Sequence, residues 1–148
     1  MRTTRLLALT LLAATAAALP AAPAVAQGQS ANELKRFITP TRNIGCFGDG
    51  TGVRCDIRVT SATPPKKPAN CRLDWGSAFE VNRTGKGHGL CVGDTALPAP
   101  NEKAPVLKYG HTIRLGHGLK CTSRRTGLTC RNADDHGFTL SKTVIRLF

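Results

Sequence analysis

The chain has few aromatic and few acidic residues. Of its 148 residues, five are Phe, one is Tyr and one is Trp, and nine Asp and Glu stand against 21 Lys and Arg. Binding of single-stranded nucleic acid uses aromatic side chains for base stacking, so their scarcity argues against specific nucleic-acid recognition. The formal net charge of +12 favours acidic partners such as anionic polymers or lipid head groups. The same charge can also serve only to keep an exported protein soluble.

Long apolar runs are missing after residue 26, and the run before it has the layout of a secretory signal. Two arginines precede an apolar stretch over residues 6–19, and a small-x-small site follows at Ala24–Ala26. A membrane span needs about 20 apolar residues, so this stretch is too short. We predict a signal peptide over residues 1–26 and one secreted, extracellular domain over residues 27–148, without a membrane span.

Six cysteines beyond the predicted cleavage site indicate a disulfide framework. An even number in a small exported chain is typical of disulfide-rich domains. Zinc ligands are usually separated by two to four residues, whereas at least eight residues separate any two of these cysteines. The six are Cys46, Cys55, Cys71, Cys91, Cys121 and Cys130.

The first and last cysteine pairs share the pattern Cys-x5-Gly-apolar-x-Cys. Each segment is typical of a β-hairpin with a four-residue loop, Asp49–Gly52 or Arg124–Gly127, whose last Gly favours a positive φ. Directly opposed residues of antiparallel strands are close enough for a disulfide. The pattern therefore predicts the pairs Cys46–Cys55 and Cys121–Cys130, which leaves Cys71 to pair with Cys91.

The remaining chain consists mainly of short stretches with strand character. Apolar and polar residues alternate over 53–60, the period of a strand with one buried face. Only Asn32–Phe37 has helical character, with Pro40 as its stop. The sequence predicts an all-β fold, a small disulfide-stapled antiparallel sandwich or barrel built from hairpins, with at most one short N-terminal helix. Further strands are expected over residues 71–75, 78–83, 88–92, 106–109, 112–115, 119–123, 128–131, 138–141 and 143–148.

Exposed loops are predicted over the Pro-rich residues 61–70 and 93–104, where binding residues often lie. Trp75 either packs over the Cys71 disulfide or forms an exposed platform for a ligand. Together with Arg124 and Arg125, at the tip of the last hairpin, it makes up the predicted ligand surface.

Catalytic chemistry has little support in the sequence. The four histidines adjoin glycine and lack the close spacing of metal ligands, so they are best explained as turn residues. A small hydrolase would need a histidine with a carboxylate, but nothing in the sequence sets such a geometry. We expect no metal, no cofactor and no enzymatic activity. The histidines are His88, His111, His117 and His136, and the glutamates are Glu33, Glu80 and Glu102.

Ordered motifs along residues 37–141 resemble a family of small secreted actinobacterial proteins classed as a domain of unknown function. The resemblance leads us to expect Ser-Gly at positions 41–42 and Gly at position 135, where this chain has Thr41-Arg42 and Asp135. It implies no catalytic or binding residues. The motifs are Phe37-Ile-Thr-Pro40, Asn43-Ile-Gly-Cys46, Arg54-Cys-Asp-Ile57, Cys71-Arg-Leu-Asp-Trp-Gly76, Cys91-Val-Gly-Asp-Thr95, Leu107-Lys-Tyr-Gly110, Gly127-Leu-Thr-Cys130 and His136-Gly-Phe-Thr-Leu-Ser141.

Taken together, these features favour a secreted, monomeric, non-enzymatic protein that binds an anionic envelope polymer or a protein. Two alternatives stay open: an inhibitor that presents a stapled loop such as Arg124–Gly127 to a foreign enzyme, and a small basic hydrolase acting on nucleic acid or cell wall.

Overall fold

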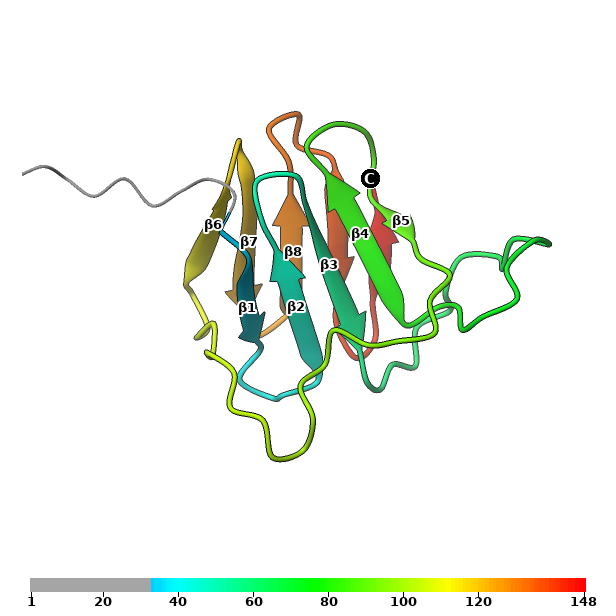
Figure 1. Ribbon diagram of the computed structural model, residues 1–148, viewed down its shortest axis with the longest axis horizontal. Helices are drawn as coiled ribbons and strands as arrows, with labels where there is room; N and C mark the ends of the chain where they lie inside the picture. Colours follow the sequence, from blue (N-terminus) through cyan, green and yellow to red (C-terminus); the bar gives the residue numbers. More distant parts are fainter. Residues whose placement is uncertain (1–32) are drawn as a thin grey trace, which may run out of the picture.

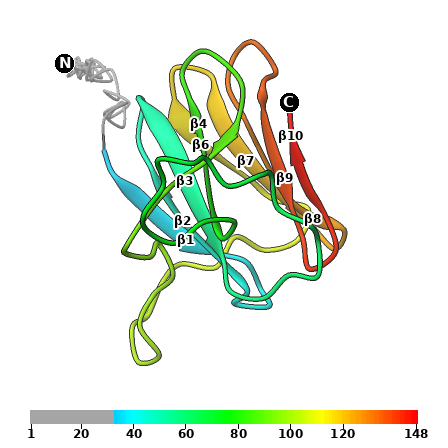
Figure 2. The same ribbon diagram turned by 90° about the vertical axis from the view of Figure 1, so that its right-hand side faces the viewer.

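Two five-stranded antiparallel sheets pack face to face in this protein (Figures 1 and 2). The structure is a computed structural model that describes residues 33–148. The all-β prediction is confirmed, and the two sheets form a sandwich and not a closed barrel. No helix within the described residues is long and apolar enough to cross a membrane. The predicted signal peptide over residues 1–26 lies outside the described residues.

Each sheet is a meander, in which every strand pairs with the next one along the chain. The first sheet holds β1 (Lys35–Ile38), β2 (Ile44–Gly48), β3 (Gly52–Ile57), β4 (Ala78–Asn82) and β5 (His88–Gly89). The second sheet holds β6 (Thr112–Gly116), β7 (Leu119–Arg124), β8 (Gly127–Arg131), β9 (Gly137–Leu140) and β10 (Ile145–Leu147).

The two sheets repeat one plan, which extends the likeness between the two cysteine hairpins. In each sheet a disulfide joins the second strand to the third, between directly opposed residues whose Cα atoms are 4.1 Å apart. A phenylalanine of the fourth strand lies opposite the third-strand cysteine, Phe79 in the first sheet and Phe138 in the second. The chain thus contains two equivalent five-strand units, with Cys55 and Cys130 75 residues apart.

The disulfides Cys46–Cys55 and Cys121–Cys130 lie in the centre of the core. Their four sulfur-bearing residues are almost fully buried, and the Sγ atoms of Cys55 and Cys130 are 3.8 Å apart across the sandwich. The third disulfide joins Cys71 to Cys91 outside the sheets. All three pairs are those expected from the spacing. The core is completed by Phe37, Ile44, Val53, Ile57, Phe79, Val81, Leu107, Leu115, Leu119, Leu128, Phe138 and Leu140.

One end of the sandwich is closed by a hydrogen-bonded asparagine. Asn132 follows β8 and is 1% exposed. Its side-chain amide donates to the carbonyls of Asn82 (3.1 Å) and Gly85 (2.9 Å) on the first sheet, and its Oδ1 accepts from the amides of Asp134 and His136. Because these bonds satisfy the buried side chain, Asn132 fixes the two sheets together at this end.

The predicted N-terminal helix is wrong where the structure describes it, because residues 35–38 form β1. Phe37 pairs with Cys46 in the register and enters the core, while Ile38 is buried beside Val106, with which it forms a parallel bridge. Phe37 and Ile38 are adjacent in the chain and are buried on opposite faces. This pattern is typical of a strand covered on both sides, whereas an amphipathic helix buries a single face. Tertiary packing here overrides the local helical preference.

Other expected elements differ in detail. Residues 71–75 and 106–109 form only isolated bridges, through Asp74 and Val106, instead of strands. The last hairpin turns through two residues, Arg125 and Thr126, and the positive φ expected at Gly127 is present (+141°). Gly52 has no positive φ, because the side chain of Asp49 accepts hydrogen bonds from Thr51 and shapes that loop instead.

Candidate functional site

A row of four threonines crosses the solvent-facing side of the second sheet. These residues, which we call the threonine row, stand opposite one another on neighbouring strands. The hydroxyls bond in two pairs, Thr112 with Thr122 (2.8 Å) and Thr129 with Thr139 (3.0 Å). The four threonines face the solvent because successive side chains of a strand alternate between its two faces, and the apolar neighbours of each threonine in the chain enter the core. The row therefore forms a flat polar strip. Its members are Thr112, Thr122, Thr129 and Thr139.

Five basic residues flank this row, and we call them the cationic face. Three of them stand opposite one another on β6, β7 and β8, each two residues along its strand from a threonine of the row: Arg114, Lys120 and Arg131. Arg146 opposes Thr139 at one edge, and Arg124 follows Thr122 along β7. At the usual strand spacing of about 4.8 Å, the five strands span roughly 19 Å. The surface thus presents spaced cations over the width of a whole sheet.

Few carboxylates neutralise the cationic face. Within residues 33–148, only Arg131 among its five members forms an ion pair, with Asp135 at 3.6 Å. The ring of Phe148 lies 5.0 Å from the Arg131 guanidinium carbon and 5.3 Å from that of Arg146. Contacts of this kind orient guanidinium groups while leaving their N–H donors free. Lys120, Thr122, Arg124, Thr129, Arg131 and Asp135 also line a shallow hollow of about 350 Å³.

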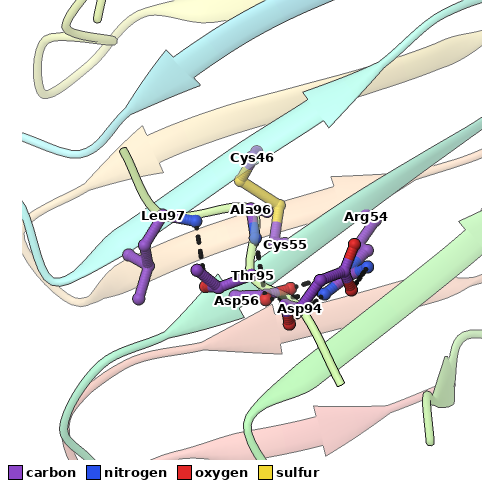
Figure 3. A network of polar contacts seen from close by, with 8 residues as sticks. All are labelled: Cys46, Arg54, Cys55, Asp56, Asp94, Thr95, Ala96 and Leu97. Carbon is purple, nitrogen blue, oxygen red and sulfur yellow. Dashed lines mark hydrogen bonds and ion pairs between the residues drawn. A yellow bond between two sulfur atoms is a disulfide. The ribbon is translucent and has the colours of Figure 1, made fainter. Parts of the chain in front are cut away.

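The outer side of the first sheet is different, because an ionic network around the buried Arg54 and Asp56 covers part of it (Figure 3). Arg54 on β3 donates from Nε and Nη2 to the two carboxylate oxygens of Asp56, both at 2.9 Å. It also donates to the carboxylate of Asp94 (2.8 Å) and to the Asp94 carbonyl (2.9 Å). The second oxygen of Asp56 accepts from the amide of Ala96 (2.9 Å). A segment between β5 and β6 is thereby fastened to β3.

The electrostatics of this network follow from its geometry. Hydrogen bonding to Asp56 raises the pKa of Arg54 above its usual range, so the guanidinium stays charged. The hydrogen bond from Arg54 and its positive charge lower the pKa of Asp94. Bidentate arginine–carboxylate pairs of this kind are strong and directional, and here they hold a loop in place.

The predicted exposed loop over residues 93–104 is therefore wrong in part. Ala96 and Pro98 are buried, and Ala96 and Leu97 approach Gly45 on β2 so closely that a Cβ there would lie 2.9 Å from their backbone. In Figure 1 this segment passes in front of the lower end of the first sheet. The first sheet is thus covered at this end, while the cationic face of the second sheet is open.

Of the three residues of the predicted ligand surface, the structure brings Arg124 and Arg125 together and leaves Trp75 apart from them. Trp75 donates from its indole nitrogen to the carbonyl of Pro65 (2.7 Å), and its ring lies against Gly89, so it fastens the Pro-rich loop to β5. Arg124 belongs to the cationic face, and the Arg125 guanidinium carbon lies 5.1 Å from the centre of the Tyr109 ring. Arg124 and Arg125 line a cleft that does not include Trp75.

The histidines lie apart from one another in turns and at edges, and none joins a group of metal-ligating side chains within residues 33–148. The only such group there consists of Cys55, Cys121 and Cys130, whose sulfurs are already in disulfides. One histidine meets a carboxylate: His88 Nε2 lies 3.5 Å from Glu80 Oε2 on the outer side of the first sheet.

Sequence reasoning missed the threonine row and four members of the cationic face. The signal was the alternation Lys120-x-Thr122-x-Arg124 and Thr129-x-Arg131, in which the outward positions of β7 and β8, apart from Gly127, are threonine or basic. These positions form one surface only because β6 to β10 are neighbours in the sheet. The alternation within a single strand does not reveal that strand order.

The fold and its three disulfides define a disulfide-stapled β-sandwich with one open cationic face. The chain belongs to a family of unknown function, DUF6636, whose model matches residues 10–148. This confirms the expected membership of an uncharacterised family. No curated protein and no solved structure matches the chain.

Proposed function

We propose that this protein is exported and binds an anionic polymer of the cell envelope through the cationic face. The observation that carries the proposal is the set of five basic residues around the threonine row, of which only Arg131 is in an ion pair within the described residues. Export is supported by the signal-like N-terminus and by three disulfides, which form in oxidising compartments. An actinobacterial source, expected from the resemblance, stays a prediction.

A polymer fits this surface better than a small ion does. Cations distributed over roughly 19 Å of sheet, at the usual strand spacing, would each meet a different charge of an extended chain. The threonine hydroxyls between them can donate to phosphate or carboxylate oxygens or accept from sugar hydroxyls. The face holds no free aromatic ring for base stacking, since Phe148 is already engaged by two arginines.

Two other functions remain predictions. A hydrolase would draw on the pair His88 and Glu80, and turnover of RNA or cell wall that disappears in His88→Ala and Glu80→Gln would establish it. An inhibitor would draw on the Arg124–Gly127 hairpin. We prefer polymer binding over hydrolysis because Arg54, the cation opposite Glu80 in the strand register, is already paired with Asp56 and Asp94. It therefore does not assist the His88–Glu80 pair.

The direct test is binding of poly(glycerol phosphate) to the oxidised protein, with neutral dextran as the control polymer. The variant Arg114→Gln/Lys120→Gln/Arg131→Gln removes one row of the face, and Lys66→Gln/Lys67→Gln/Arg72→Gln removes the same charge from exposed loop positions. We expect the first variant to weaken binding at least tenfold and to flatten the slope of log K against log salt by about 2 to 3.

Three outcomes would contradict the proposal. The first is equal loss in the two variants, which would show a general charge effect. The second is binding that resists high salt. The third is tighter binding of single-stranded DNA than of poly(glycerol phosphate) at equal phosphate concentration, which would identify a nucleic-acid surface.

A further inference from the structure

A cleft of about 400 Å³ opens at the end of the sandwich that Asn132 does not close. It lies where three turns converge: residues 39–43 between β1 and β2, residues 125–126 between β7 and β8, and residues 141–144 between β9 and β10. Asn132 follows the far end of β8, so the two ends of the sandwich differ. One end is fastened by hydrogen bonds, and the other leaves a hollow between the sheets.

The walls of the cleft are largely apolar. Val59, which is 55% exposed, and the half-buried Tyr109 line it together with the buried residues Ile44 and Leu128. Val59 is held in this position by Asn43, which donates to its carbonyl (2.9 Å) and accepts from its amide (3.0 Å). Because two hydrogen bonds fix the backbone of Val59, its exposed side chain forms a wall of the cleft before any ligand binds.

The rim of the cleft is positively charged. Arg124, Arg125 and Lys142 line it, and no carboxylate is among the lining residues. The Arg125 guanidinium is stacked on Tyr109 at 5.1 Å, which orients it at the rim. The Lys142 carbonyl accepts hydrogen bonds from the amide and hydroxyl of Ser61, which ties this part of the rim to the loop that follows β3.

We propose that the cleft binds a small amphipathic anion, with a carboxylate or phosphate head on an apolar body. The head would lie between the three cations of the rim, and the body would cover Val59 and the ring of Tyr109 and displace water from them. The volume of about 400 Å³ falls within the range of small-molecule sites. Arg124 belongs to both the rim of the cleft and the cationic face, but the other residues that line the cleft lie outside the cationic face, so this inference does not depend on polymer binding.

The test uses octanoate and octyl phosphate as probes of the two head groups, with octanol and acetate as controls that lack the charge or the apolar body. Binding is followed by two-dimensional amide NMR of the oxidised protein. We expect saturable shifts at Asn43, Val59, Gly127 and Lys142 with one or both amphipathic anions, and no saturable shifts with octanol or acetate.

Three variants separate this site from general charge attraction. Arg125→Gln/Lys142→Gln should weaken binding of the anion by about tenfold or more. Val59→Glu, at an exposed position that tolerates a polar residue, should abolish binding by placing a like charge in the cleft. Arg83→Gln/Lys86→Gln, which removes the same charge from the loop between β4 and β5, should leave binding within twofold.

The inference would be overturned by any of three results: no saturable shift with either anion, octanol binding as well as octanoate, or equal weakening in the Arg83/Lys86 variant. The Arg114/Lys120/Arg131 variant keeps the cleft intact, so its octanoate affinity should be unchanged. Loss of octanoate binding in that variant would place the anion on the cationic face and reject the cleft.

Discussion

The two sheets present equivalent faces to each other and different faces to the solvent. On the inside, the positions of Cys55 and Phe79 in the first sheet correspond to Cys130 and Phe138 in the second. On the outside, Arg54 of β3 corresponds to Thr129 of β8, counting from the matched cysteines. Arg54 is buried beneath the loop that carries Asp94, whereas Thr129 lies in the open threonine row.

The two units are constrained to be alike on their inner faces and not on their outer faces. The inner faces must fill one shared core, so both units keep a disulfide and a phenylalanine at matched places. The outer faces do not share a core, and each contacts only solvent or the loops that cover its own sheet. The first sheet carries a covering segment that ionic contacts of Arg54 fasten, and the second leaves its basic residues uncovered.

Removal of a central disulfide is expected to have the largest effect, and to be alike in the two sheets. Cys46→Ala/Cys55→Ala and Cys121→Ala/Cys130→Ala each release a loop worth about 3 kcal/mol of chain entropy. Each also leaves a cavity in the core, adding roughly 1 kcal/mol or more. Urea unfolding measures both losses, which we expect to agree within about 1 kcal/mol because the sites are equivalent.

Cys71→Ala/Cys91→Ala is the control for that comparison. It releases a loop of similar cost but removes no sulfur from the central core. A central variant that is no less stable than this control would contradict the structural role given to the stacked disulfides.

The matched pair Arg54 and Thr129 should show the difference between the outer faces. Arg54→Met leaves the carboxylate of Asp56 buried without its partner, a change that costs about 3 kcal/mol or more. Thr129→Val loses one half-exposed hydroxyl contact and should cost less than about 1 kcal/mol. Denaturant unfolding of both variants tests this. Equal costs would mean that the ionic network contributes no more than an open surface position.

Acid should loosen the cover of the first sheet. The pKa of Asp94 is lower in the folded state than in the unfolded chain, because Arg54 favours its charged form. Its stabilising contribution is therefore present at neutral pH and is lost as the pH falls through the folded-state pKa. The protection of the Ala96 amide against exchange, measured relative to its intrinsic rate at each pH, should fall in acid, and Asp94→Asn should show low protection at neutral pH already. Unchanged protection of the Ala96 amide under both changes would contradict the role given to Asp94 in fastening the segment over the first sheet.

The smallest effects are expected in two turns, one in each sheet. Arg42 (φ +56°) and Asp135 (φ +60°) have left-handed backbones at the two positions where the family resemblance leads us to expect glycine. Arg42→Gly should stabilise the protein by about 1 kcal/mol, since glycine removes the steric cost. Asp135→Gly should gain less, because Asp tolerates this conformation better and its contact with Arg131 is lost. Thermal unfolding measures both, and destabilisation by Arg42→Gly would contradict the prediction.

Much of the fold could be predicted from local patterns. The spacing of the cysteines indicated the two central hairpins, and alternation over 53–60 indicated β3, because both signals arise within one hairpin or strand. β1 could not be predicted in this way. Its residues have helical preference, and only pairing with β2 and contact with Val106 make them a strand.

The candidate surfaces were harder to predict than the fold. Arg124 and Arg125 were identified as exposed basic residues, but the row that joins Arg114, Lys120 and Arg131 exists only once three strands are in register. The cover over Arg54 depends on Asp94, 40 residues away in the chain. A pattern within one strand or loop cannot predict a contact between residues so far apart in the sequence.

The central claim is that only the second sheet offers an open binding face, and amide NMR with poly(glycerol phosphate) tests it most directly. We predict shifts at Thr122, Thr129 and Arg131 and none at Arg54 or Ala96. Shifts concentrated on the first sheet, or spread equally over both, would contradict it.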